Sequence, residues 1–201
     1  MSPPGQIWQS LRPSVLRNIA STATIDASMP SPVGHAIAGV AAAFAVSAAL
    51  KPRTLSIPIV LASAALAISP DFDLLAGPHR TYTHSIGAVA AVGIASCLVL
   101  ARRPSDPLAP ALALATAYAS HLMLDWLSKD TAPPSGLAAL WPFSWTYYQS
   151  PWTVFGEISR RYWLPNEFIV SNMLAALWEG VVLTPFLIVA WTTWSRRTLG
   201  K

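Results

Sequence analysis

The chain has 201 residues, of which 53% are hydrophobic and only 11% are charged. Soluble domains usually carry about 25% charged residues, so this composition is typical of a membrane protein and argues against a soluble globular domain. The formal net charge of +4 does not indicate a nucleic-acid partner, because the basic residues are scattered among the segments that connect the apolar stretches.

The first 33 residues are rich in proline and serine and carry Arg12 and Arg17. They lack the continuous apolar core of a secretory signal peptide. We therefore expect residues 1–33 to form a tail or a segment that lies on the membrane surface. Residues 34–201 are expected to form a single membrane-embedded helical domain.

Five apolar stretches follow, and they cover residues 34–50, 54–69, 86–101, 108–127 and 168–191. A straight helix needs about 20 residues to cross the hydrocarbon core and seldom fewer than ~17, so three of the five are short. Short helices could belong to a soluble core, but these stretches are apolar on all sides rather than amphipathic. The sequence therefore predicts an all-α, polytopic membrane helix bundle with about five transmembrane helices.

Basic residues concentrate in the segments that follow the first, third and fifth helices, which share one membrane face if there are five spans. These basic residues are Lys51, Arg53, Arg102, Arg103, Arg196, Arg197 and Lys201. The positive-inside rule places this face in the cytoplasm. We expect a multi-pass protein of the inner (cytoplasmic) membrane.

All four histidines and three aspartates are predicted at helix ends on the opposite, outer face: His35, Asp71, Asp73, His79, His84, His121 and Asp125. Ionisable residues next to membrane segments are costly and usually mark function. Some have simpler explanations, since His35 could be an interfacial or capping residue and Asp71 could favour a helix N-terminus. His121 and Asp125 are four residues apart and share a helical face, so they form either a structural hydrogen bond or a pair of metal ligands.

Ligand chemistry explains the joint occurrence of these residues better than separate capping roles. Zinc and similar divalent ions take imidazole nitrogen and carboxylate oxygen, and catalytic sites keep one position open for water. A water held by such an ion can attack a phosphoryl or acyl centre. We expect a divalent metal, with zinc the first candidate and one or two ions bound by six residues: His35, Asp71, Asp73, His84, His121 and Asp125.

Two further residues of the same stretch are candidates for catalysis. Arg80 suits an anionic substrate because guanidinium binds phosphate in a bidentate manner, although an arginine here could also extend to the lipid headgroups. His79 could be a metal ligand, a general acid, or a neighbour bonded to a carboxylate. The sequence does not separate these three roles.

The segment 128–167 between the last two helices is rich in aromatic residues, including Trp141, Trp145 and Trp152. Such rings prefer the headgroup layer, so we expect an interfacial anchor, or else a roof over the metal site that admits a lipid headgroup. Glu179 lies in the middle of the last apolar stretch and is expected to turn inward to a partner. It could hold a ligand histidine in place by accepting a hydrogen bond from it, or be protonated and structural.

Several short motifs follow one another along the chain: HAIAG at 35–39, PDFD at 70–73, HRTYTHS at 79–85, HLMLD at 121–125 and GLAALWPFS at 136–144. Together they resemble the YdjM-like family of bacterial inner-membrane, metal-dependent hydrolases. The family is similar to zinc-dependent phospholipases C and to single-strand-specific zinc nucleases. This resemblance implies zinc ligands at His35, Asp71 or Asp73, His84, His121 and Asp125. Those soluble enzymes use further histidines later in the chain, and none follows His121 here, so we expect one or two ions rather than three.

The residues and the resemblance lead to one hypothesis and one rival. The hypothesis is an integral membrane hydrolase that cleaves a phosphoester of a lipid or lipid-linked substrate at the outer membrane face. The rival is a transporter or metal-handling protein that uses the same cluster as a transit site. Transport sites are expected near the bilayer midplane between repeats, and the sequence has no such repeat. Glu179 is the residue that favours the rival.

Overall fold

The computed structural model describes residues 29–50, 55–75, 79–102, 106–130, 133–156, 158–159 and 161–200. Most of the predicted tail, together with Lys51, Arg53, Arg103 and Lys201, lies outside the described residues. Residues 29 and 30, which were expected to belong to that tail, are buried against the bundle.

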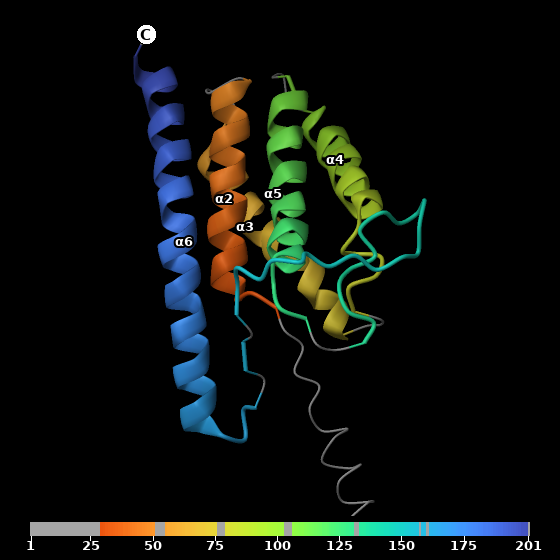
Figure 1. Cartoon of the computed structure of the whole chain (residues 1–201). Coiled ribbons are helices and arrows are strands. Elements are labelled where there is room, and N and C mark those ends of the chain that lie inside the picture. The colour runs from red at the N-terminus through yellow and green to blue at the C-terminus, as the bar shows by residue number, and fades with distance from the viewer. Residues whose placement is uncertain are drawn as a thin grey trace, which may run out of the picture.

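The described chain is all-helical, as predicted, and it has five α-helices. These are α2 (Pro32–Ala49), α3 (Ile57–Ile68), α4 (Ile86–Leu100), α5 (Leu108–Trp126) and α6 (Pro165–Leu199). In Figure 1, α6, α2, α5 and α4 follow one another across the bundle, and α3 lies behind α2 and α5. A short 3₁₀ helix, η2 (Ser69–Leu75), continues directly from α3. Within the described residues, β-pairing is limited to isolated bridges such as the one between Leu137 and Tyr148.

Local sequence signals explain where several helices begin. The side chain of Ser31 caps α2 by accepting a hydrogen bond from the backbone N–H of Gly34, and Pro32 occupies the first turn. Ser85 caps α4 in the same way through the backbone N–H of Ala88. Serine at the N-cap satisfies a backbone donor that otherwise has no partner, and proline suits the first helical position.

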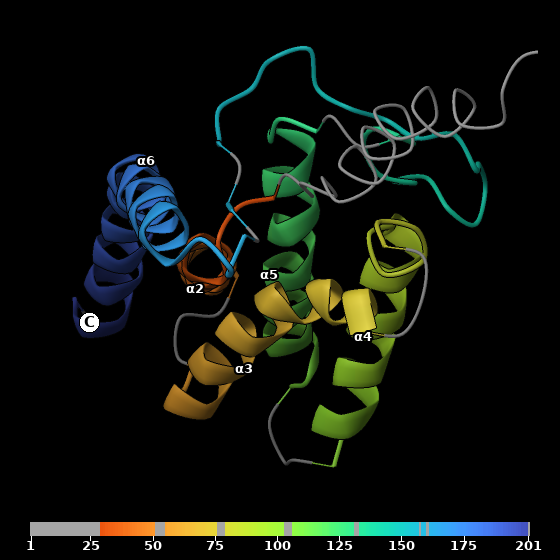
Figure 2. The same cartoon turned by 90° about the horizontal axis from the view of Figure 1, so that it is seen from below.

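α5 forms the centre of the bundle and is the most completely buried helix. α2, α3 and α4 pack around it, while α6 packs along α2. In both Figure 1 and Figure 2, α6 lies beside α2 and on the side away from α4. Many of the contacting residues are alanine and glycine, which allow helices to approach closely where lipid provides no hydrophobic drive.

Three helical segments are long and apolar enough to cross a membrane by length and composition: Pro32–Ala49, Ile57–Leu75 and Pro165–Leu199. α4 is a shorter apolar helix. α5 is not among the three candidate spans, and it carries polar side chains that face inward, including His121 and Asp125. The five-span topology stays a prediction.

The helix bounds differ from the predicted ones mainly in α6, which begins at Pro165 and continues to Leu199. The apolar stretch ends at residue 191, but hydrogen bonding continues through a polar last turn that contains Arg196 and Arg197. Basic residues there interact favourably with the negative end of the helix dipole. α6 also remains one continuous helix through Pro185.

Candidate metal centre

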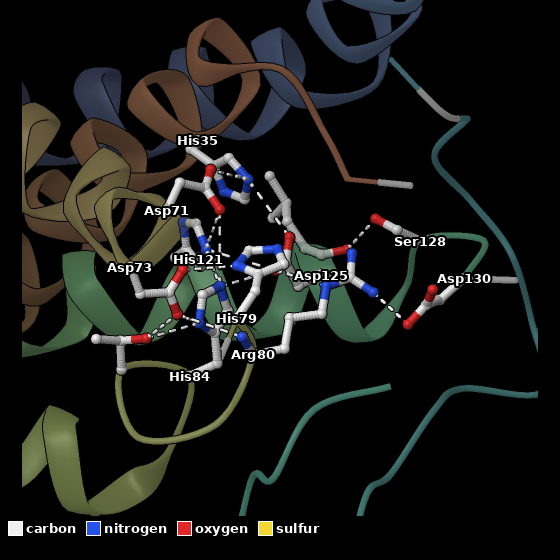
Figure 3. A network of polar contacts seen from close by, with 12 residues as sticks. His35, Asp71, Asp73, His79, Arg80, His84, His121, Asp125, Ser128 and Asp130 are labelled. Atoms are coloured by element: carbon white, nitrogen blue, oxygen red, sulfur yellow. Dashed lines mark hydrogen bonds and ion pairs between the residues drawn. The ribbon is translucent and has the colours of Figure 1, made fainter. Parts of the chain in front are cut away.

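Four donor residues from three separate parts of the chain converge in the buried interior at one end of the bundle (Figure 3). η2 supplies Asp71, the turn before α4 supplies His84, and α5 supplies His121 and Asp125. Each offers one ligand atom, and these four atoms lie within 4.8 Å of one another. We call these four residues the donor quartet.

The spacing of the quartet suits a small divalent ion. The Nε2 atoms of His84 and His121 are 3.0 Å apart. Oδ2 of Asp125 lies 3.2 Å from Nε2 of His84 and 3.5 Å from Nε2 of His121. Oδ1 of Asp71 lies 3.7 Å and 3.5 Å from the same two nitrogens. Four ligands held tetrahedrally at ~2.0–2.1 Å from zinc are separated by ~3.3–3.4 Å, so the observed distances fit.

Hydrogen bonds behind the two histidines turn their Nε2 atoms toward the centre. Nδ1 of His121 is 2.7 Å from the carbonyl oxygen of Ala67, so this nitrogen carries the proton and donates it. Nδ1 of His84 faces Oδ2 of Asp73 at 3.3 Å and the hydroxyl of Thr83 at 2.9 Å. Donation from Nδ1 leaves the lone pair on Nε2, which is how metal-binding histidines are usually oriented.

His35 lies beside the quartet and faces the other side of its carboxylates. Its Nε2 atom is 3.5 Å from Oδ1 of Asp125 and 3.9 Å from Oδ2 of Asp71. Its ring stacks on that of His121, with the two centroids 3.8 Å apart. Each carboxylate therefore presents one oxygen to the quartet's histidines and the other to His35. This arrangement suits either a second ion that shares the carboxylates or a hydrogen bond from His35.

Asp73 and His79 lie next to the quartet rather than within it. Oδ1 of Asp73 is 2.6 Å from Nδ1 of His79. Its Oδ2 accepts hydrogen bonds from the Thr83 hydroxyl at 2.5 Å and the Arg80 backbone N–H at 3.2 Å. Both oxygens of Asp73 thus have hydrogen-bond partners, and its position behind His84 is that of a supporting residue. Asp73, His79 and His84 nevertheless form a second close group of possible metal ligands.

Arg80 is buried, with 5% of its surface exposed, and points to carboxylates rather than to the protein surface. Its guanidinium forms an ion pair with Asp130, and its Nε atom lies 3.9 Å from Oδ2 of Asp125. Arg80 also adopts a positive φ of 63°, a conformation that is uncommon outside glycine. Arg80 therefore does not extend to the lipid headgroups. Its guanidinium already pairs with a carboxylate, so a phosphate would have to compete with that carboxylate for it.

Asp130 is the residue of this site that the sequence analysis did not single out. It is 8% exposed, and it pairs with Arg80 and accepts a hydrogen bond from the backbone N–H of Gly136 at 2.7 Å. Through Arg80, which lies beside Asp125 of the donor quartet, it connects the quartet to the aromatic segment. Its partner lies 50 residues away in a turn, and no local pattern in the sequence indicates that pairing.

The site gathers buried side-chain atoms that lack a hydrogen-bond partner. Among the described residues these include both nitrogens of His35, Oδ1 of Asp71, Nε2 of His79 and both oxygens of Asp125. A buried polar atom without a partner costs about 1–3 kcal/mol, and more if it is charged. A divalent cation would satisfy these carboxylate oxygens and imidazole lone pairs together, so the residues fit a zinc-like ion.

The carboxylates also make the centre strongly electronegative. Burial alone lowers the pKa of His84, but the nearby carboxylates of Asp125, Asp71 and Asp73 outweigh it and hold that pKa well above its usual value. A high imidazole pKa reports a negative potential around the ring. The same potential favours the entry of a positive ion.

Glu179 lies in α6 with 1% of its surface exposed, and within the described residues it bonds to Ser31 and to no histidine. It accepts a hydrogen bond from the backbone N–H of Ser31 at 2.8 Å and another from its hydroxyl. Ser31 is the N-cap of α2, whose first turn carries His35. Glu179 therefore acts on the site indirectly, because it holds the start of the helix that positions His35.

The aromatic segment lies at the same end of the bundle and packs against the turn that holds Arg80 and His84. The hydroxyls of Tyr147 and Thr81 are 2.8 Å apart, and the backbone N–H of Ala138 donates to the carbonyl oxygen of Arg80 at 3.0 Å. Several of its large aromatic side chains are exposed: Phe143, Trp145, Trp152, Tyr162 and Trp163. The segment can therefore serve both as an interfacial anchor and as a cover beside the site.

Residues 29–199 match the model of the family described as YdjM inner membrane protein. This range contains every described helix and every candidate ligand. No match was found among curated proteins or among solved structures.

Proposed function

The chain belongs to the YdjM inner membrane protein family, and we propose that it is a metal-dependent hydrolase that cleaves a phosphoester of a lipid or lipid-linked substrate. The observation that carries this proposal is the donor quartet, whose ligand atoms lie within 4.8 Å of one another in the buried interior. A hydrogen-bonded cluster without an ion would be expected to satisfy its own polar atoms. Here several remain without a partner.

In this proposal Asp71, His84, His121 and Asp125 hold the ion, and His35 either binds a second ion through the shared carboxylates or orients them. A bound divalent ion supplies Lewis-acid polarisation of a phosphoryl oxygen and lowers the pKa of a water that it holds. Asp73 and the carbonyl of Ala67 keep the imidazoles of His84 and His121 in the ligating tautomer. Such supporting contacts set the orientation of the ligands and their basicity.

His79 is the candidate for moving a proton at the leaving oxygen. Its Nδ1 atom is fixed by Asp73 at 2.6 Å, while its Nε2 atom is buried and has no hydrogen-bond partner in the part of the chain that the structure describes. A histidine oriented by a carboxylate with its other nitrogen available can act as a general acid. Arg80 can bind the phosphate of the substrate, as predicted, only if that phosphate replaces Asp130 as the partner of the guanidinium. If Asp130 stays in place, the role of Arg80 is to position Asp125.

The lipid character of the proposed substrate rests on the surroundings of the site. The aromatic segment covers the same end of the bundle and exposes Phe143, Trp145 and Trp152. Large aromatic side chains favour the headgroup layer. A phosphoester at that layer would meet the metal centre without leaving the membrane.

Metal analysis of detergent-purified protein tests the centre directly. We expect at least one equivalent of divalent metal per chain and its loss in the double variant His121→Ala/Asp125→Ala. The matched control is Thr116→Ala/Ser120→Ala, since both residues lie on α5 at the same spacing and their hydroxyls donate to carbonyl oxygens of their own helix. Protein that retains its metal in the ligand double variant, or that never holds any, contradicts the proposal.

A screen against soluble phosphoesters and phospholipids tests the reaction. Activity should disappear after treatment with a chelator and return when zinc or another divalent ion is added. His79→Gln should lower the turnover while leaving the metal content unchanged. If the metal-loaded protein cleaves no phosphoester but carries metal across proteoliposome membranes, the transport alternative replaces this proposal.

A further inference from the structure

A groove of about 770 Å³ runs between α2 and α6, away from the metal centre. Its α2 wall is almost entirely alanine, including Ala41, Ala45 and Ala49, and its α6 wall includes Phe186 and Val189. One charged side chain, Arg197, lines the end of the groove near the C-terminus. Cavities of ~300–1,000 Å³ with apolar walls and one polar anchor are typical of ligand sites.

The two helices that form the groove run in the same direction, and a hydrogen bond joins them near each end of α2. Glu179 bonds to Ser31 at the N-terminal end of α2, and Nη1 of Arg197 donates to the carbonyl oxygen of Ala48 at its C-terminal end, at 2.6 Å. Figure 1 shows them side by side between these points. The groove follows α2 from Ala38 to Ala49, which is ~16 Å at a rise of ~1.5 Å per residue.

This length matches one leaflet of a bilayer, since the full hydrocarbon core is ~30 Å thick. An acyl chain that enters from the Arg197 end would therefore be covered by the alanine wall down to about the midplane. Alanine side chains leave room for a chain between the helices, whereas larger residues would fill the groove.

Arg197 supplies a charge that complements a phosphate at the mouth of the groove. The side chain is exposed, one of its N–H groups bonds to Ala48, and no acidic side chain pairs with it among the described residues. Arg196 is its exposed neighbour. Guanidinium binds phosphate in a bidentate manner, and basic sites between membrane helices bind anionic lipid headgroups.

We propose that the α2–α6 groove binds an anionic phospholipid, with one acyl chain against the alanine wall and the phosphate on Arg197. A helix from a second copy of the chain would bury this guanidinium against apolar surface without an anion, which is costly. A phospholipid provides both an apolar chain for the alanine wall and an anion for Arg197. The site is separate from the metal centre and does not depend on the proposed hydrolase activity.

Native mass spectrometry of the protein with added phosphatidylglycerol tests the site, with phosphatidylcholine, which is zwitterionic and has no net charge, as the comparison. We expect Arg197→Gln to weaken phosphatidylglycerol binding about ten-fold, the loss of one charge-assisted contact. Ala45→Phe should fill the groove and abolish binding of both lipids there. The matched controls are Arg102→Gln, an exposed arginine at the end of α4, and Ala95→Phe, an exposed position on α4.

The controls should bind lipid as the wild type does, and circular dichroism should show all four variants folded. Equal lipid binding in Ala45→Phe and Ala95→Phe would overturn the proposal. So would phosphatidylglycerol binding that is insensitive to Arg197→Gln. A change from dimer to monomer in Ala45→Phe, without any change in bound lipid, would instead identify the groove as an interface between copies.

Discussion

Glu179 is a buried carboxylate that joins α6 to the start of α2, the helix that carries His35. A carboxylate with 1% exposure carries a large desolvation cost. Two hydrogen bonds from Ser31 offset this cost, and the positive end of the α2 dipole adds to them. Gly34 makes the approach possible, because a Cβ at that position would collide with the Glu179 side chain.

Replacing Glu179 with alanine should destabilise the protein by about 1–3 kcal/mol, because the backbone N–H of Ser31 would lose its buried acceptor. Glu179→Gln keeps one acceptor oxygen, so this variant should lose less stability than the alanine variant. The measurement is the midpoint of thermal unfolding in detergent, followed by circular dichroism.

Glu167→Ala is the control on the same helix, since Glu167 is exposed and its ion pair within the described residues is with Arg161. Its effect should stay within about 0.5 kcal/mol, as is usual for surface ion pairs. If the alanine variants of Glu179 and Glu167 lost equal stability, the capping role of Glu179 would be wrong.

At the scale of single residues, the sequence predicted the position of a side chain best where its partner lies on the same regular helix. It predicted least where the backbone is irregular or the partner is distant in sequence. The pair His121 and Asp125 could be placed on one face because α5 is a regular helix. Asp71 and Asp73 could not be distinguished, because they lie in a 3₁₀ helix that apolar patterning does not reveal. In such a helix residues two apart point in different directions, so Asp71 enters the quartet while Asp73 faces His79 and Thr83.

At the scale of the helices, the contact between α2 and α3 positions two members of the quartet, Asp71 and His121. α3 continues into η2, which carries Asp71, and the carbonyl oxygen of Ala67 near the end of α3 orients His121. Gly39 on α2 faces this same part of α3. A Cβ at Gly39 would meet the Ala67 side chain and would lie 2.9 Å from the carbonyl oxygen of Ser63.

Gly39→Ala should therefore push α3 away from α2, with a cost of about 1–3 kcal/mol for overpacking. Because Ala67 moves with α3, the variant should also bind less metal than the wild type. The measurements are thermal unfolding and metal content of the same preparation.

Gly180→Ala on α6 is the matched control, because no atom lies within 4 Å of a Cβ at that position. Alanine favours a helix over glycine by about 0.5–1 kcal/mol, so this variant should be unchanged or slightly more stable. Normal stability and metal content in Gly39→Ala would show that the α2–α3 contact does not set the site.

The existence and order of the five helices could be predicted because each is a continuous apolar stretch. Their ends were less predictable where other forces act. α6 extends beyond its apolar stretch through Arg196 and Arg197, and α3 begins only at Ile57, with a proline in its first turn. The long-range contacts of Arg80 and Asp130 depend on the folded turn and could not be inferred from either segment alone.

At the scale of the whole molecule, the donor quartet lies at one end of the bundle, and the basic residues that follow α4 and end α6 lie at the other. α2 begins, α3 and η2 end, and α5 ends next to the quartet, so alternating helix directions bring distant residues to one end, as predicted. Arg102, Arg196 and Arg197 lie at the other end, after α4 and in the last turn of α6. This asymmetry is the basis of the predicted orientation.

Cysteine labelling can decide that orientation with two exposed positions. In a Cys97→Ala background, Phe143→Cys marks the end with the metal centre and Arg102→Cys marks the basic end; Phe143 is 86% exposed. The positive-inside rule predicts that a membrane-impermeant maleimide modifies Phe143→Cys in intact cells and Arg102→Cys only after permeabilisation. Labelling of both variants in detergent controls for intrinsic reactivity. The reverse pattern would place the metal centre in the cytoplasm, so that a lipid substrate would have to come from the inner leaflet.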